Sequence, residues 1–247
     1  MIDKLKLFFR RYSPPFFYSF ARHCYWKIRQ LTVIMLGTKI EERRWANRSF
    51  EEIQKRFTNL NHPHRQLLLK KIGALYPISS ILEIGCGYGP NLYLIAKQFP
   101  KIELVGIDIN PLSIREGNKL LTKDRISNVK LMYGKADELH QFRNKNFDIL
   151  FTDALLMFIG PDKIKKVMGE MFRITRRALI LVEWHCKSQN KDPYGLGVYY
   201  LDCWKRNYID LLKEFTLKDR IRLTKIPNKL WPEKNWQELG YLIEVIL

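Results

Sequence analysis

The residues best suited to bind a charged small molecule lie between Glu83 and Asn91. Glycines stand at 85, 87 and 89, after the apolar run of residues 78–84 and directly before Pro90. Glycines at alternate positions let the backbone adopt positive φ and approach a ligand closely. A helix that begins at Pro90 would direct its free N–H groups and the positive end of its dipole at that ligand. The pattern predicts a buried strand, a ligand-binding turn and a helix.

Two acidic residues indicate the kind of ligand. The dinucleotide fingerprint G-x-G-x-x-G would need glycine at position 90, where this chain has Pro90. Glu83 would repel a pyrophosphate but suits a cationic amino-acid tail. Asp108 closes the apolar run of residues 102–107, nineteen residues after Gly89. A carboxylate that ends the second strand at this spacing can accept hydrogen bonds from ribose hydroxyls.

These residues resemble the first motif of the class I S-adenosylmethionine-dependent methyltransferases, commonly E/D-x-G-x-G-x-G with an acid at the end of strand two. Residues 134–139, Gly-Lys-Ala-Asp-Glu-Leu, are similar to the family's G-x-A-D/E-x-L motif, in which the acid reads the adenine edge. The resemblance covers roughly residues 60–247. It implies S-adenosyl-L-methionine as the cofactor, a small-molecule acceptor and no metal. The cofactor-binding residues that it implies are Glu83, Gly85, Cys86, Gly87, Gly89, Asp108, Ile109, Ala136, Asp137 and Thr152.

Polar residues that follow strands four and five are the candidate catalytic residues. Asp153 comes after the apolar run of residues 147–151, and Glu183 and His185 end the next apolar strand. Side chains alternate along a strand, so Glu183 and His185 share one face and could act together or hydrogen-bond each other. Many relatives that act on small molecules carry a histidine where this chain has Phe158, so a histidine base is not expected at that position.

Strands and helices alternate from residue 78 onward, which predicts a parallel sheet covered on both faces. The resemblance implies a doubly wound, mostly parallel sheet of seven strands whose last strand is antiparallel. We expect a helix over residues 161–174, a loop over 190–200 that walls the acceptor, a helix over 204–215 and a Trp-rich loop at Trp231 and Trp236. His62 and His64 lie beside a proline, and no third metal ligand is visible nearby.

Residues 1–60 are expected to form a basic, aromatic, helical extension, and residues 61–247 the cofactor-binding domain. The first 40 residues hold eight Lys/Arg and one Asp/Glu. An apolar stripe at helical spacing runs from Phe17 to Met35. Residues 1–36 could lie on an anionic membrane surface, cap the substrate cleft, contact a second subunit or pack on their own domain.

Composition narrows the function further. The four cysteines show no C-x-x-C or metal spacing, and no apolar run reaches membrane-spanning length, so we expect a cytoplasmic protein with reduced thiols, peripheral at most to a membrane. The function expected is methyl transfer to a small molecule, such as a saccharide or a lipid-linked intermediate. The net charge of +18 keeps an RNA methyltransferase as the alternative, although strand four lacks the Pro-Pro-Tyr ending of amino-methylating nucleic-acid enzymes. A non-catalytic cofactor-binding module is a third alternative, against which the intact glycine turn and Asp108 argue.

Overall fold

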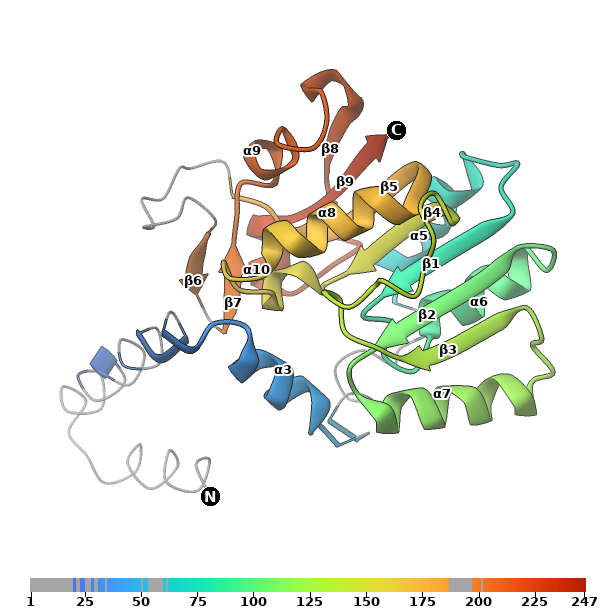
Figure 1. Ribbon diagram of the computed structural model, residues 1–247, viewed down its shortest axis with the longest axis horizontal. Helices are drawn as coiled ribbons and strands as arrows, with labels where there is room; N and C mark the ends of the chain where they lie inside the picture. Colours follow the sequence, from blue (N-terminus) through green and yellow to red (C-terminus); the bar gives the residue numbers. More distant parts are fainter. Residues whose placement is uncertain are drawn as a thin grey trace.

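A seven-stranded sheet forms the centre of the computed structural model, which describes residues 20, 23–24, 28, 31–33, 35–49, 51–52, 60, 62–186, 197–200 and 202–247 (Figure 1). The strand order is β3-β2-β1-β4-β5-β9-β8. β9 runs antiparallel to both of its neighbours, β5 and β8, and the other pairs are parallel. The predicted fold class is confirmed. The strands are β1 (Ser80–Ile84), β2 (Glu103–Asp108), β3 (Val129–Tyr133), β4 (Phe147–Asp153), β5 (Thr175–Trp184), β8 (Ile221–Lys225) and β9 (Gly240–Ile246).

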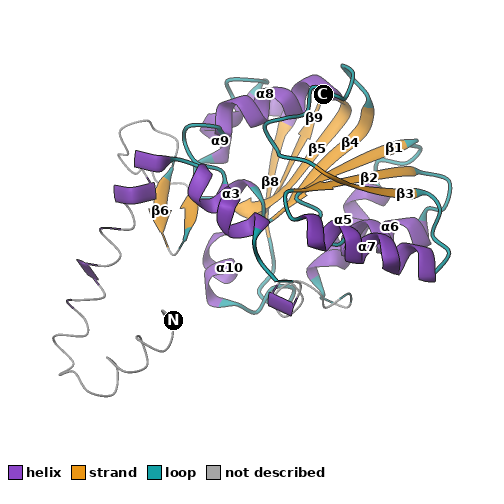
Figure 2. Ribbon diagram, turned by 60° about the horizontal axis from the view of Figure 1, so that its bottom comes forward, coloured by secondary structure: helices purple, strands orange, loops and turns teal. Residues whose placement is uncertain are grey.

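Helices cover both faces of this sheet (Figure 2). One face carries α5 (His64–Gly73), α6 (Pro90–Gln98) and α7 (Pro111–Lys123), and the other carries α8 (Ile164–Ile174) and α9 (Tyr208–Leu212). Since successive strand residues point to opposite faces, β1 sends Ile81 into the first core and Leu82 into the second. Both side chains are fully buried, and each stabilises the fold by about 1.5–3 kcal/mol.

The register of the parallel strands brings the acidic residues to one edge of the sheet. Ile84 lies opposite Ile107 of β2 and Thr152 of β4. The residues at the carboxyl ends of these strands, Glu83, Asp108 and Asp153, are therefore neighbours although the sequence separates them. Ligands of open parallel sheets bind beyond this edge.

The helices that follow β1 and β2 begin as their sequences predict. Gly89 has φ of +84° and precedes Pro90, which is the first residue of α6. Asn110 caps α7 by accepting a hydrogen bond from the backbone N–H of Ser113 at 2.9 Å. Both helix starts point at the carboxyl edge of the sheet, so the local sequence positions the future site.

Several predicted elements after strand four are wrong. α8 begins at Ile164 instead of residue 161, because residues 161–163 form a turn whose Asp162 binds the N-terminal part of the chain. Val198–Tyr200 is a strand, β6, paired with β7 (Cys203–Lys205), although residues 187–196 lie outside the described part. The predicted helix over 204–215 shrinks to α9, since the hairpin takes its first residues and Asn207 caps the helix there. Trp236 lies in a short helix, α10 (Lys234–Leu239), instead of a loop.

The N-terminal segment is joined to the domain through α3 (Lys39–Ala46). Thr38 donates its backbone N–H and its hydroxyl to the Asp162 carboxylate at 2.9 and 2.7 Å, and its hydroxyl oxygen accepts from Gly160 N–H at 2.7 Å. At the other end of α3, the Asn110 amide donates to the carbonyls of Trp45 and Arg48 at 3.0 and 2.8 Å. No helix among the described residues is long and apolar enough to cross a bilayer. The division at residue 60 stays a prediction.

Candidate active site

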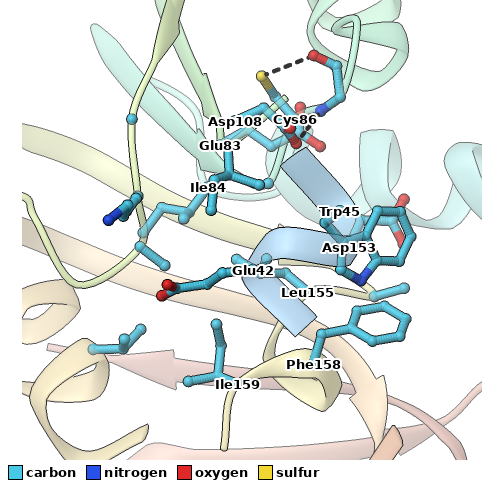
Figure 3. A pocket seen from close by; sticks show the side chains of 18 of the residues that line it. Glu42, Trp45, Glu83, Ile84, Cys86, Asp108, Asp153, Leu155, Phe158 and Ile159 are labelled. Carbon is cyan, nitrogen blue, oxygen red and sulfur yellow. Dashed lines mark hydrogen bonds between the residues drawn. The ribbon is translucent and has the colours of Figure 1, made fainter. Parts of the chain in front are cut away.

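A cavity that is partly open to solvent lies at the carboxyl edge of the sheet (Figure 3). Its space, the open mouth included, is about 1060 Å³. Six carboxyl groups and two lysines line it, so its wall is acidic in a chain whose net charge is +18. The charged lining residues are Glu41, Glu42, Glu83, Asp108, Asp137, Asp153, Lys135 and Lys163.

The glycine turn and Asp108 form one wall. Gly87 has φ of +56°, and a β-carbon built there would meet no atom within 4 Å, so this part of the backbone faces open space. Gly85 also has positive φ, but a β-carbon there would lie 2.8 Å from Leu155. Asp108 accepts the backbone N–H groups of Gly87 and Asn110, both at 2.8 Å. Each carboxylate oxygen keeps a lone pair, so Asp108 can hold the turn and still accept ligand hydroxyls.

Glu83 lies deeper in the same wall. One oxygen, Oε1, accepts from Asn91 Nδ2 at 2.8 Å, whereas Oε2 is buried and has no hydrogen-bond partner among the described residues. Burial raises the pKa of Glu83 to about 8, and the neighbouring Asp153 carboxylate also raises it. A buried carboxyl oxygen without a partner is costly and indicates a cationic or hydrogen-bonding ligand at this point.

Three further residues predicted to bind the cofactor include Asp137, the residue expected at the adenine edge. Ile109, Ala136 and Asp137 all line the cavity. Asp137 lies 2.9 Å from Lys163 Nζ, and Lys163 also binds Glu42 of α3. Cys86 lines the cavity as well, but burial raises the pKa of its thiol well above the ordinary value, which excludes a reactive thiolate.

The sequence analysis did not anticipate that α3 would form part of the cavity wall. Thr38, Glu41, Glu42 and Trp45 line the cavity from a segment assigned to the extension. Tyr199 of β6 holds Glu41 through a hydrogen bond of 2.9 Å. A single tryptophan in the highly charged stretch of residues 39–48 was the one signal in the sequence that this helix has a buried side.

Two residues predicted to bind the cofactor, Gly89 and Thr152, lie behind the cavity wall and do not line it. Gly89 serves as the helix cap, and a β-carbon there would crowd Leu131 at 3.0 Å. Thr152 is fully buried and donates its hydroxyl to Glu183 at 2.9 Å. Both residues support the cavity wall, and their contact with the cofactor stays a prediction.

Glu183, a candidate base in the sequence analysis, has the contacts of a structural residue. Its carboxylate accepts the backbone N–H groups of Leu155, Leu156 and Met157 at 3.1, 2.8 and 3.1 Å, in addition to the Thr152 hydroxyl. These groups belong to the turn that follows β4, which includes the short helix η1 (Leu156–Phe158). Burial raises the pKa of Glu183 to about 7. The side chain fastens the β4–η1 turn and does not line the cavity.

His185 lies outside the cavity wall too. It is buried, its Nδ1 accepts from Tyr208 N–H at 3.2 Å, and its ring packs edge-on against Tyr241. Of the three candidate catalytic residues, Asp153 is the one that lines the cavity. The described residues contain no group of three or more potential metal ligands.

Comparison with known proteins shows which family the central part of the chain resembles. Residues 81–178 match the family model described as a methyltransferase domain. A malonyl-[acyl-carrier protein] O-methyltransferase from Anoxybacillus flavithermus is 26% identical over 129 residues, which cover 52% of this chain and 46% of that protein. The chain spans about half the length of the curated relatives that it matches first.

Solved structures agree with the fold. A SAM-dependent methyltransferase from Aquifex aeolicus matches with a TM-score of 0.58 and 15% identity, over 81% of this chain and 99% of that one. Geranyl diphosphate C-methyltransferase from Streptomyces coelicolor A3(2) matches with a TM-score of 0.59 and 13% identity, over 81% and 85%. Residues 81–178 therefore resemble a methyltransferase domain, and the chain has the fold of the class I S-adenosylmethionine-dependent enzymes.

Proposed function

We propose that this protein transfers a methyl group from S-adenosyl-L-methionine to a small-molecule acceptor. The observation that carries the proposal is the acidic cavity at the carboxyl edge of the sheet, with the unpartnered Oε2 of Glu83 and the open backbone at Gly87. The cofactor fits this donor set because it combines a cationic amino-acid tail, ribose hydroxyls and an adenine ring. When bound, it supplies a methyl group on a positively charged sulfur.

The chain's own residues would divide the work of binding this molecule. Glu83 would face the amino-acid tail, Asp108 the ribose hydroxyls and Asp137 the adenine edge. Because α3 and the β4–η1 turn close the cavity on the acceptor side, they would exclude water and hold the acceptor near the methyl group.

The cofactor assignment is tested by ligand-dependent stability. S-adenosylhomocysteine at one hundred times its dissociation constant should stabilise the protein by about 2.7 kcal/mol. In a chain of this size, that free energy corresponds to a rise in melting temperature of about 5–10 °C. Asp108→Ala should lose most of the rise, whereas Asp219→Ala, at an exposed position of the short helix η2 (Lys218–Arg220), should keep it. Equal shifts in both variants would refute the ribose assignment.

For the acceptor we propose an amphiphilic small molecule, such as a lipid-linked intermediate or a saccharide, used by a cytoplasmic enzyme at an anionic membrane surface. Five large apolar side chains among the described residues before α3 support this choice, since 56–84% of each is exposed. They are Phe20, Ile28, Leu31, Met35 and Leu36. The structural neighbour from Streptomyces coelicolor is a geranyl diphosphate methyltransferase, which makes an amphiphilic acceptor chemically reasonable on this fold.

Transfer of labelled methyl groups tests the acceptor class. The protein is incubated with labelled cofactor and either a lipid and saccharide extract or bulk RNA. We expect label in the lipid or saccharide fraction. Label in RNA that moderate salt abolishes would favour the RNA methyltransferase instead, because salt weakens phosphate contacts steeply.

A further inference from the structure

The start of α5 lies directly against Asp153. His64 Nε2 is 2.8 Å from Asp153 Oδ2, and Arg65 lies 3.8 Å from the same oxygen. His64 and Arg65 are the first two residues of α5, and both side chains are buried. This helix lies before the segment that matches the methyltransferase model, at residues 81–178, so the match assigns no role to it.

The two oxygens of Asp153 have different surroundings. Oδ2 forms the hydrogen bond with His64 and also accepts one from Asn91 Nδ2 at 3.0 Å. Oδ1 is buried and has no hydrogen-bond partner among the described residues, in a side chain that lines the cavity. Asn91 Nδ2 also donates to Glu83, whose Oε2 likewise has no partner. One amide thus joins two carboxyl groups, and each keeps one buried oxygen for a ligand.

The His64 ring is held in place from both sides. It packs on Trp231 with ring centroids 4.0 Å apart, and Trp231 stacks on Trp236 at 3.6 Å. Its Nδ1 lies 2.5 Å from Nδ1 of His62. A ring fixed in this way orients the carboxylate that it contacts, and a fixed carboxylate binds a ligand without first losing its own freedom.

The charges around Asp153 make it a poor base and a good anion. Burial alone would raise its pKa, but His64 and Arg65 hold the pKa well below the ordinary value. A carboxylate that resists protonation takes up a proton weakly, which argues against the general-base role expected from its position after strand four. The same carboxylate is well suited to a permanent ion pair with a cation.

We propose that His64 is a positioning residue that holds Asp153 so that its Oδ1 binds the ammonium group of the cofactor's amino-acid tail. The proposal rests on the proposed function and extends it to a residue outside the matched domain. In this arrangement Glu83 and Asp153 bind the ammonium group together, and Asn91 Nδ2 bridges the two carboxyl groups. His64 acts through Asp153 and does not itself line the cavity.

Two ligands separate recognition of the tail from recognition of the nucleoside. S-adenosylhomocysteine carries the amino-acid tail, whereas 5′-methylthioadenosine lacks it. Calorimetric titration of the full chain with both should give a Kd ratio that reports the tail alone. Asp153→Asn should raise the Kd for S-adenosylhomocysteine at least tenfold, because it removes a charge-assisted contact. It should leave the Kd for 5′-methylthioadenosine unchanged.

His64 variants test the positioning role. His64→Leu should raise the Kd for S-adenosylhomocysteine about tenfold and leave the Kd for 5′-methylthioadenosine unchanged. His64→Gln, whose amide can donate from nearly the same place, should restore most of the loss. The double variant H64L/D153N should bind no more weakly than D153N, since both changes remove one interaction. Gln66→Leu, at an exposed position of the same helix, is the matched control.

Several results would overturn the proposal. If H64L weakens both ligands equally, His64 has only a packing role, and if it weakens neither, Asp153 does not depend on it. Unchanged tail recognition in D153N would remove the ammonium site itself. Should H64L fail to fold, His64→Met keeps the bulk without the donor and gives the same readout. A wild-type chain that binds neither ligand would instead refute the proposed function.

Discussion

The indole of Trp45 packs edge-on against the ring of Phe158, with the ring centroids 4.6 Å apart (Figure 3). Trp45 belongs to α3 and Phe158 to the turn after β4, so the contact joins the N-terminal segment to the carboxyl edge of the sheet. Phe158 stands where many small-molecule relatives carry a histidine. In this chain the position therefore contributes to the closing wall instead of offering a base.

The first prediction follows from this contact. Trp45→Ala should raise the Kd for S-adenosylhomocysteine about tenfold, because the wall loses a large apolar contact surface next to the ligand. The increase should appear mainly in the dissociation rate, measured by stopped-flow fluorescence or surface plasmon resonance. Arg43→Ala, at an exposed position of the same helix, should bind as the wild type does. Equal Kd values in W45A and wild type would show that α3 does not close on the ligand.

The second prediction concerns pH. Burial raises the pKa of Glu83 to about 8, so the free protein carries this side chain mostly protonated at neutral pH. Binding an ammonium group requires the ionised form and releases the proton. Affinity for S-adenosylhomocysteine should therefore rise with pH, by nearly tenfold between pH 6 and pH 7, and level off near pH 8. Titration calorimetry in buffers of different ionisation enthalpy measures the proton release directly.

The variant Glu83→Gln separates binding from stability at the same residue. Its affinity should be low and nearly independent of pH. Its stability should exceed that of the free wild type increasingly as pH rises from about 4.5 to about 8, because the folded wild type retains a proton that the unfolded chain releases. Urea unfolding at several pH values measures the difference. A pH dependence of binding that persists in E83Q would assign the titration to another group.

Part of this site could be predicted from sequence because its signals are local. The bounds of β3 and the starts of α6 and α7 follow from apolar runs and from the prolines at 90 and 111. The contact between His64 and Asp153 could not be predicted, since 89 residues separate them and a histidine beside a proline resembles a loop. The contact between Thr38 and Asp162 could not be predicted either, since 124 residues separate them. Packing of the finished fold creates both contacts.

Strand five illustrates a different limit. Alternation correctly placed Glu183 on one face of the strand, but it could not tell whether that face meets a ligand or the chain itself. The carboxylate meets three backbone N–H groups of the turn after β4. An acid at the carboxyl end of a strand therefore has the same sequence signature whether it catalyses or holds a turn.

The third prediction tests whether Glu183 holds the turn after β4. Glu183→Gln should destabilise the fold by about 3 kcal/mol, because it places an amide group against backbone donors that need an acceptor. Thr152→Val removes one of the four hydrogen bonds and should cost about 1 kcal/mol. Urea unfolding measures both. If E183Q is as stable as the wild type but loses methyl transfer, Glu183 is a catalytic residue after all.

The last prediction concerns the apolar side chains before α3. An anionic surface attracts nearby basic residues by about 1 kcal/mol each, and the first 40 residues have a net charge of +7. The protein should therefore sediment with vesicles that contain anionic phospholipid, much less with neutral vesicles, and less at high salt. Leu31→Ser with Met35→Ser should reduce binding to anionic vesicles more than tenfold, since 60% and 84% of these side chains are exposed and available for insertion.

Leu217→Ser is the matched control, because Leu217 is 66% exposed but lies in the distant loop before β8. It should bind vesicles as the wild type does, and all three proteins should have the same melting temperature. The alternative is that the apolar stripe contacts protein, a second copy of this chain included. In that case L31S/M35S would bind anionic vesicles as well as the wild type, and analytical ultracentrifugation would show a change in its oligomeric state. Loss of vesicle binding with an unchanged oligomeric state would favour the membrane surface, because serine at these two positions removes apolar area while leaving every basic residue in place.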